Sequence, residues 1–391
     1  MEEMNPNFSV PGTEYQPPKI LIPEQWSEAA FNITNESITT VPPISFICGP
    51  KNSGKTTFSR HLLNTLLQRY DKVAYLDTDV GQPEFTAPGC LSLSIFDKPP
   101  DLAVTYIRTP ERCIFFGDIS SKRDPETYLK NIFSLYDYYH AQYYMSNESK
   151  SGNPGKPMLP LVINTPGWVK GIGYELLVSM LRYISPTHVI QVRITAQSKN
   201  LPSGAFWLDE EKRENEGLNL IEIYAAREDS YRHSVLTLKD AKLIRDLRIK
   251  AYFRQCFPEN MEFSFKELAY ALCSHPPYEV PISSVKITHL YGQVPSSEIY
   301  RGLNASIVAL AVSSTKSTDG EPSTPWCVGL GIVRAIDLSK DLLYILTPVP
   351  QRILAKVDLL LQGFIEIPTG LLQEQGCRSP YMSANVLPYK C

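Results

Sequence analysis

The sequence lacks any pattern of cysteine and histidine that would form a metal centre. Its 8 cysteines include no C-x-x-C pair, and its 6 histidines are not spaced as metal ligands. It also has no apolar run of about 18 residues, and its N-terminus is acidic and rich in proline. We therefore expect free thiols, no structural zinc, no membrane and no secretory signal, which places the chain in the cytosol or nucleus.

A generally basic surface is also missing. Lys and Arg number 38 against 41 Asp and Glu, a formal net charge of −3. Any contact with nucleic acid must therefore come from a local cluster of cations. The length of 391 residues and a hydrophobic content of 43% are ordinary for a globular protein of about two domains.

The order of apolar segments predicts an extended arm, an α/β domain and a β-rich domain. Residues 1–40 contain several prolines and no apolar periodicity, so they read as an extended N-terminal arm. Residues 41–279 alternate between strands and helices, which is typical of a mainly parallel sheet. We expect strands over 44–48, 72–77, 104–107, 113–118, 159–163, 187–194 and 220–226, and helices over 56–70, 126–144 and 174–184.

From residue 280 to 391 the pattern changes to short strands. Five apolar stretches predict a smaller, mostly β domain, with a boundary near residue 280. They span 285–290, 306–312, 326–336, 342–348 and 364–368.

The stretch GPKNSGKTT predicts a phosphate-binding loop. It fits G-x-x-x-x-G-K-[ST], follows a predicted strand and opens a predicted helix. Lys55 would contact the β and γ phosphates, and the Thr56 hydroxyl would bind Mg²⁺. An ordinary glycine turn is the alternative. The residues assigned to the nucleotide are Gly49, Pro50, Lys51, Asn52, Ser53, Gly54, Lys55, Thr56 and Thr57.

Asp77 and Asp79 follow the next predicted strand, at the edge where α/β sheets bind ligands. Alternation along a strand would point both side chains the same way. One carboxylate could hold Mg²⁺ and the other could accept a proton from an incoming hydroxyl, or one could merely cap the next turn. The residues do not decide between them, and we assign Asp77 to the metal and Asp79 to the base, with Gln82 on the substrate side.

The stretch NTPGW, residues 164–168, follows another predicted strand. GTP switches often carry Asp where this chain has Asn164, and no N-K-x-D motif is present, so ATP is favoured over GTP. Trp168 could stack on a base of single-stranded nucleic acid, or it could be a core residue.

The main basic cluster lies between residues 227 and 254, a segment that contains eight Lys and Arg residues but only four Asp and Glu residues. On a helix beginning near Thr237, Lys242, Arg245 and Arg248 would share one face, opposite a packed stripe of Ile244, Leu247 and Ala251. Such a helix could act as a lid that stabilises a transferring phosphoryl group, or it could be a solvated face.

Together these four segments resemble the polynucleotide 5′-hydroxyl kinases. Within that family, CVGLGIVRAIDLSKDLLYILTPVP at residues 327–350 is similar to the nucleolar branch that processes ribosomal RNA. The resemblance implies ATP- and Mg²⁺-dependent phosphorylation of RNA 5′-hydroxyl ends in the nucleolus. It also implies an endoribonuclease partner that leaves such ends.

The resemblance assigns roles to residues of this chain. Lys55, Asp77, Asp79, Arg245 and Arg248 match the catalytic motifs. The family's clasp segment, which holds the RNA end, corresponds in this chain to Asn164, Thr165, Pro166, Gly167 and Trp168.

The large N-terminal domain of animal and fungal relatives corresponds here to the forty-residue arm. Two other functions stay open. One is an ATP-binding scaffold without kinase activity, and the other, which the sequence disfavours, is a GTP switch.

Overall fold

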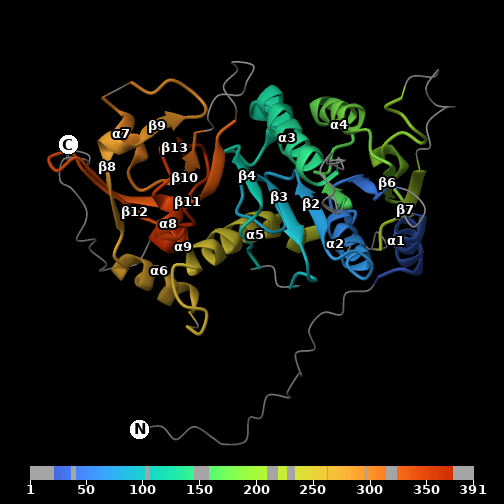
Figure 1. Ribbon diagram of the computed structural model, residues 1–391, viewed down its shortest axis with the longest axis horizontal. Coiled ribbons are helices and arrows are strands. Elements are labelled where there is room, and N and C mark those ends of the chain that lie inside the picture. The colour runs from blue at the N-terminus through green and yellow to red at the C-terminus, as the bar shows by residue number, and fades with distance from the viewer. Residues whose placement is uncertain are drawn as a thin grey trace, which may run out of the picture.

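The computed structural model describes residues 22–36, 41–101, 106–144, 158–208, 219–226, 234–261, 263–295, 297–313 and 324–372 (Figure 1). In these ranges no helix is long and apolar enough to cross a membrane.

Among the described residues, seven strands form the first sheet in the order β4-β3-β2-β5-β1-β6-β7. All pairs are parallel except β2–β3 and β3–β4. The mainly parallel sheet predicted from the sequence is thus confirmed. The strands are β1 (Ile44–Cys48), β2 (Val73–Asp77), β3 (Cys90–Phe96), β4 (Arg112–Phe115), β5 (Leu161–Asn164), β6 (His188–Arg193) and β7 (Asn219–Tyr224).

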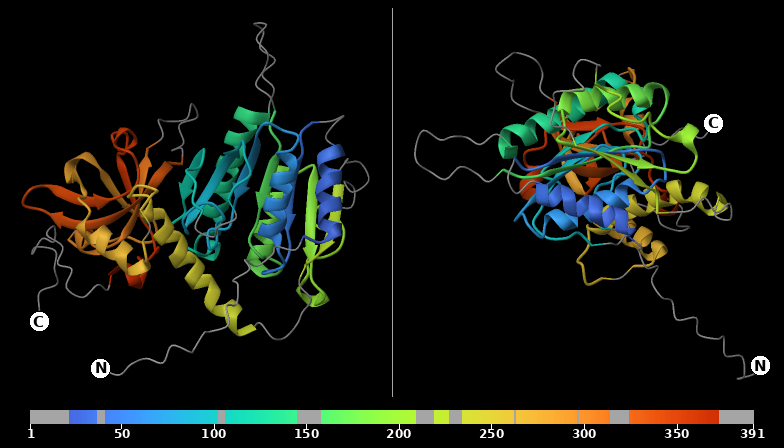
Figure 2. Two further views of the ribbon diagram at one scale, coloured as in Figure 1. Left: turned by 90° about the horizontal axis from the view of Figure 1, so that it is seen from below. Right: turned by 90° about the vertical axis from the view of Figure 1, so that its right-hand side faces the viewer.

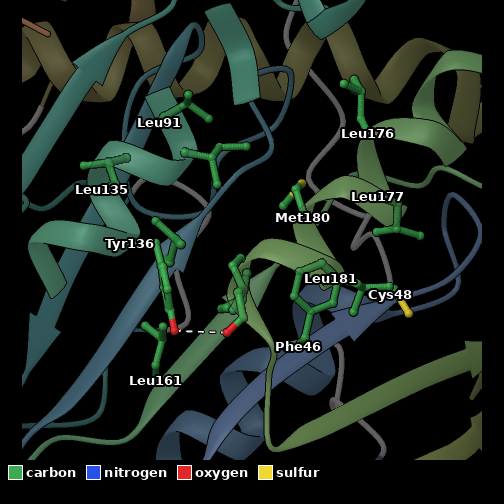
Figure 3. Packing of buried hydrophobic residues seen from close by; sticks show 14 of the residues in the cluster. Phe46, Cys48, Leu91, Leu135, Tyr136, Leu161, Leu176, Leu177, Met180 and Leu181 are labelled. Atoms are coloured by element: carbon green, nitrogen blue, oxygen red, sulfur yellow. Dashed lines mark hydrogen bonds between the residues drawn. The ribbon is translucent and has the colours of Figure 1, made fainter. Parts of the chain in front are cut away.

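Helices cover both faces of this sheet, as Figure 2 shows in its right-hand view. Helices α3 (Pro125–Tyr139) and α4 (Gly171–Ile184) pack on one face, and α1 (Glu24–Glu36) and α2 (Lys55–Leu66) on the other. Alternate residues of β1 serve the two cores: Phe46 faces α4, and Ile47 faces α2. Figure 3 shows the first core, in which the Tyr136 hydroxyl donates to the Ile184 carbonyl at 3.0 Å.

The second sheet has six strands among the described residues, in the order β8-β12-β11-β10-β13-β9. Its pairs are antiparallel except β13–β9. This confirms the mostly β character of the C-terminal part. The strands are β8 (Tyr278–Pro281), β9 (Lys286–His289), β10 (Ile307–Val312), β11 (Trp326–Asp337), β12 (Leu342–Leu346) and β13 (Leu359–Gln362).

The two sheets share a core. Ile249 and Phe253 of α5 (Ser234–Arg254) pack together with Phe115 of β4 and Leu330 of β11. Helix α5 therefore runs between the two parts, as Figure 2 shows in its left-hand view. The remaining helices are α6 (Phe265–Ser274), α7 (Ile299–Leu303), α8 (Gln351–Leu354) and α9 (Thr369–Leu372).

Several predicted elements were wrong. Residues 24–36 of the predicted extended arm form α1, and the rest of the arm before residue 22 lies outside the described residues. Strand β3 was not predicted at all. The stretch 364–368 is not a strand; the strand in this region, β13, lies earlier and ends at Gln362. In the predicted helix 126–144, the α-helical part ends at Tyr139 and a π-helical turn, His140–Tyr144, follows. The predicted strand 104–107 lies partly outside the described residues, and the part that is described is not strand. The domain boundary near residue 280 stays a prediction.

Candidate active site

Three parallel strands bring the candidate residues to one edge of the first sheet. Asn164, at the end of β5, is in register with Asp77 at the end of β2 and with Ile47 of β1. The phosphate-loop segment starts directly after β1. Because the carboxyl ends of parallel strands share an edge, the loop, the aspartates and residues 164–168 lie together.

The loop between β1 and α2 has the shape of an anion cradle. Gly49, Asn52 and Gly54 have positive φ angles of 144°, 61° and 95°. The Ser53 hydroxyl donates to the Pro50 carbonyl at 2.9 Å and fixes the turn from within. Successive backbone N–H groups in such a turn, at the N-terminus of a helix, form a concave site for anions.

Lys55 is the cation of this cradle. Its side chain is 7% exposed, and Nζ donates to the Pro50 carbonyl at 2.6 Å. Burial lowers the Lys55 pKa to about 8, although the charge of Asp79 opposes the shift. The ammonium group is therefore mostly charged at neutral pH and is already desolvated. Of the other loop residues, Thr56 is half-buried, and Lys51, Asn52 and Thr57 are exposed.

Trp26 of α1 supports the loop from behind, and sequence reasoning missed it. A Cβ atom at Gly54 would lie 2.6 Å from Cη2 of Trp26, so only glycine fits there. The indole Nε1 donates to the Tyr224 carbonyl at 2.7 Å. The spacing of Trp26, Ala30 and Ile33, all buried, was the helical signal that could have revealed α1.

Asp77 is a buried carboxylate held by three donors. Its Oδ2 accepts from the Glu84 N–H at 2.5 Å, and its Oδ1 accepts from Asn164 Nδ2 at 3.2 Å and from the Asp79 N–H at 3.3 Å. Burial nevertheless raises the Asp77 pKa to about 7. A cation at this position would lower that pKa again by stabilising the charged form.

Asp79 lies beyond the strand, because β2 ends at Asp77. Strand alternation therefore does not place its side chain, contrary to the sequence argument. Instead Oδ1 of Asp79 accepts from the N–H groups of Gly81 and Gln82, both at 3.0 Å. The half-buried Asp79 and Gln82 thus sit in one turn at the sheet edge.

Residues 164–168 divide into a buried and an accessible part. Asn164 and Thr165 are each 1% exposed, and the Thr165 hydroxyl donates to the Ile47 carbonyl at 2.7 Å. Both side chains thus make hydrogen bonds within the fold, with Asn164 bonded to Asp77, and their predicted contact with substrate stays a prediction. Pro166 is buried as well.

The accessible part lies against the phosphate loop. A Cβ atom at Gly167 would lie 2.5 Å from the Lys51 Cα atom. Trp168 is half-buried, and its ring meets Tyr128 edge-on at 5.4 Å between centroids. Trp168 therefore has both a core contact and an accessible surface.

Helix α5 carries the predicted lid residues. Arg248 is buried and pairs with Glu84, with 3.2 Å between Nη2 and Oε2, while its Nη1 donates to the Glu84 carbonyl. Arg245 is half-buried and Lys242 exposed. The predicted packed stripe was wrong, because Ile244, Leu247 and Ala251 are half-buried and the buried apolar side chains in the described part of α5 are Ile249 and Phe253. The side chains of Arg227, Arg232 and Lys239 lie outside the described residues.

The oxygen donors at this edge suit Mg²⁺. A magnesium ion bound together with nucleotide phosphates needs only one or two protein oxygens, such as the Thr56 hydroxyl and the Asp77 carboxylate. In the described part of the chain, no group of three or more His, Cys, Asp or Glu side chains is arranged to hold a metal alone. The site therefore fits a metal that arrives with a nucleotide.

Comparison with known proteins agrees with this geometry. Residues 49–255 match the family described as the mRNA cleavage and polyadenylation factor CLP1 P-loop, and residues 273–368 match the NOL9-like C-terminal domain. Two solved structures of Clp1p with Pcf11p share the fold, with TM-scores of 0.59 and 0.56 over 87% of this chain and 79% and 78% of theirs. Their identities of 15% and 16% support the fold alone.

Three relatives by sequence carry the name polynucleotide 5′-hydroxyl-kinase NOL9. The protein of Arabidopsis thaliana is 57% identical over 94% of this chain and 96% of its own length. Those of Danio rerio and Homo sapiens are 33% and 32% identical over 85% and 89% of this chain. The chain spans about half of these two animal relatives, 47% and 52%. Such identity over nearly the whole chain, with matches to both halves, shows that the chain belongs to the NOL9 family of polynucleotide 5′-hydroxyl kinases.

Proposed function

We propose that this protein transfers the γ-phosphoryl group of ATP to the 5′-hydroxyl end of RNA. The observation that carries the proposal is the meeting of an anion cradle, a buried lysine and two aspartates at one sheet edge. A nucleotide-binding switch needs the cradle but not a second carboxylate in the turn beside it. The relatives named above are polynucleotide 5′-hydroxyl kinases, which supports the same reaction.

The loop N–H groups and Lys55 would bind the β and γ phosphates of ATP. Thr56 and Asp77 would hold Mg²⁺, which when bound supplies positive charge against the phosphate oxygens. Asn164 keeps Asp77 in place through its 3.2 Å hydrogen bond.

Asp79 would accept the proton of the RNA hydroxyl. Its Oδ1 is held by the Gly81 and Gln82 N–H groups, and among the described residues Oδ2 has no hydrogen-bond partner. One oxygen is therefore oriented while the other can receive a proton. Trp168, next to the loop, would stack on the terminal base and align the hydroxyl with the phosphate.

We infer the biological setting from the branch of the family. The natural substrate would be a precursor of ribosomal RNA with a 5′-hydroxyl end, processed in the nucleolus. The enzyme that creates this end would be an endoribonuclease, and a complex of the two would hand the end over directly.

The test is transfer of label from γ-labelled ATP to 5′-hydroxyl oligonucleotides of RNA and DNA. We expect label on the RNA end in the wild-type protein and none with Lys55→Ala. A protein that binds ATP tightly but labels neither nucleic acid would contradict the kinase and support the ATP-binding scaffold instead.

A further inference from the structure

A continuous row of aromatic rings links Trp168 to the C-terminal sheet. Trp168 meets Tyr128 at 5.4 Å, Tyr128 meets Phe116 at 5.7 Å, Phe116 meets Tyr291 at 5.8 Å, and Tyr291 stacks on Phe364 at 5.5 Å with 13° between the ring planes. Tyr128 and Phe116 are fully buried. The row thus has a core section and two accessible ends, Trp168 and Phe364.

The far end of the row consists of two rings of the C-terminal part that are held against the first part of the chain. Tyr291 follows β9 and Phe364 follows β13, and we call these two residues the ring pair. The Phe364 N–H donates to the Gly117 carbonyl at 2.6 Å, and a Cβ atom at Gly363 would lie 2.2 Å from the same carbonyl oxygen, so only glycine fits at residue 363. This backbone contact fixes the ring pair against the loop after β4.

A guanidinium group lies on the ring pair. Cζ of Arg123 is 4.3 Å from the centroid of Phe364 and 5.6 Å from that of Tyr291. Asp118 accepts from Nε of Arg123, which holds the guanidinium against the rings. Lys122 beside it is exposed. Aromatic faces next to cations are what single-stranded nucleic acids use for stacking and for neutralising phosphates.

Phe364 remains open to solvent in spite of these contacts, with 52% of its surface exposed. Burial of a large ring is favourable, so an exposed ring that is nonetheless held rigidly by stacking and a backbone bond suits a ligand. On the loop after β4 that contacts Phe364, the exposed large apolar side chain among the described residues is Ile119, with 44% of its surface exposed. Flanked by two cations, this small area fits a base better than the larger apolar patch of a protein interface.

The ring pair is connected to the candidate base. A Cβ atom at Gly81 would lie 2.8 Å from the Ile119 carbonyl oxygen, so the loop that carries Arg123 touches the turn that holds Asp79. An RNA strand with its 5′ end at Asp79 can therefore continue along this loop.

We propose that Phe364, Tyr291 and Arg123 form a stacking site for a base downstream of the RNA end that receives the phosphate. This inference rests on the proposed function and adds a second contact, made by the C-terminal part, to the one at Trp168. It predicts that the protein prefers substrates long enough to reach the ring pair.

The first test compares phosphorylation of a length series of 5′-hydroxyl oligoribonucleotides, from the dinucleotide upwards. In the wild-type protein KM should fall once the strand reaches the ring pair. Phe364→Ala should raise KM for the long substrates roughly 5- to 100-fold, the range expected for loss of one stacked base, and leave kcat and the dinucleotide unchanged. Phe364→Trp should restore the length dependence. Tyr270→Ala is the matched control, because Tyr270 is a 63% exposed aromatic residue on α6.

The second test locates the base. RNAs carrying 2-aminopurine at successive positions should lose fluorescence at one internal position on binding to the wild-type protein and to Tyr270→Ala, but not to Phe364→Ala. If the wild-type protein phosphorylates RNA and Phe364→Ala keeps both the length dependence and the quenching, the proposed stacking site is wrong. The exposed ring pair would then be a contact for a protein partner instead. A wild-type protein that labels no RNA would instead refute the proposed function.

Discussion

Arg248 of helix α5 forms an ion pair with Glu84, with 3.2 Å between Nη2 and Oε2. The N–H of the same Glu84 donates to Oδ2 of Asp77 at 2.5 Å. Arg60 of α2 pairs with the other carboxylate oxygen. Glu84 therefore ties the helix that was predicted to be a lid, the helix that follows the phosphate loop and the buried aspartate into one network.

This network predicts different effects for the two lid arginines. Arg248→Ala breaks a buried ion pair and should destabilise the protein by roughly 3 kcal/mol, because the mostly buried Glu84 carboxylate loses one of its two cationic partners. Arg245→Ala, at a half-buried position where the described residues show no ion pair, should change stability by less than about 0.5 kcal/mol and lower the rate of transfer. Chemical denaturation and single-turnover kinetics on both variants separate the effects. Equal loss of stability in the two variants would contradict the assignment.

Lys55→Ala should abolish phosphoryl transfer. Its Nζ is the one side-chain cation inside the described loop, since Lys51 is exposed. Lys72→Ala, an exposed lysine before β2, is the control for a general loss of charge. Measured with γ-labelled ATP, full activity in Lys55→Ala would refute the site.

Trp168→Ala should weaken RNA binding more than ATP binding. Stacking on a base is worth about 1–3 kcal/mol, and no contact with ATP is proposed for this ring. Because Trp168 also packs on Tyr128, the variant should lose some stability, and Trp168→Phe should recover much of both. Titrations with RNA and with a nucleotide analogue measure the two affinities. An equal loss of affinity for both ligands would mean that Trp168 is a core residue only.

The sequence predicted the phosphate loop well because its chemistry is local. Gly49, Gly54 and Lys55 stand at fixed spacing between a strand and a helix, and that local spacing was enough to predict the cradle. The same holds for the parallel strands β1, β2 and β5, whose apolar runs are buried throughout.

What the sequence missed depends on partners far along the chain. The sequence did not show that the Asn164 side chain would donate a hydrogen bond to Asp77 of a neighbouring strand. Arg248 was predicted to share a helical face with Lys242 and Arg245, but its side chain is buried and pairs with Glu84, whereas Lys242 is exposed. In the arm, the prolines favoured an extended chain over the helical spacing of Trp26 and Ile33. These two residues form a buried helix face only because they pack against α2.

Asp77 should make the stability of the ligand-free protein depend on pH. Its pKa is raised from 3.8 to about 7, so the folded state binds this proton more tightly than the unfolded state. The free energy of unfolding should therefore fall as pH rises from about 4 to 7, by roughly 4 kcal/mol at most, and Asp77→Asn should lack this component. Melting curves of both proteins at pH 5 and pH 8, without Mg²⁺ and nucleotide, test it. A difference between the two that does not vary with pH would mean that Asp77 is charged throughout.

The two aspartates should fail in different ways when each is changed to asparagine. Asp79→Asn keeps an Oδ1 that can accept from Gly81 and Gln82, so the turn should persist while the base is lost. We expect single-turnover transfer to fall roughly 10²- to 10⁴-fold with ATP affinity nearly intact, because a general base acts only on the hydroxyl. Asp77→Asn should instead raise the Mg²⁺ requirement and recover partly in excess Mg²⁺ or Mn²⁺, since it removes a charged metal ligand. Transfer and ATP binding across a Mg²⁺ series distinguish these outcomes. If rescue by metal occurs in Asp79→Asn and not in Asp77→Asn, the two roles are reversed. Wild-type rates of transfer in both variants would refute both roles, because neither aspartate would then be needed for the reaction.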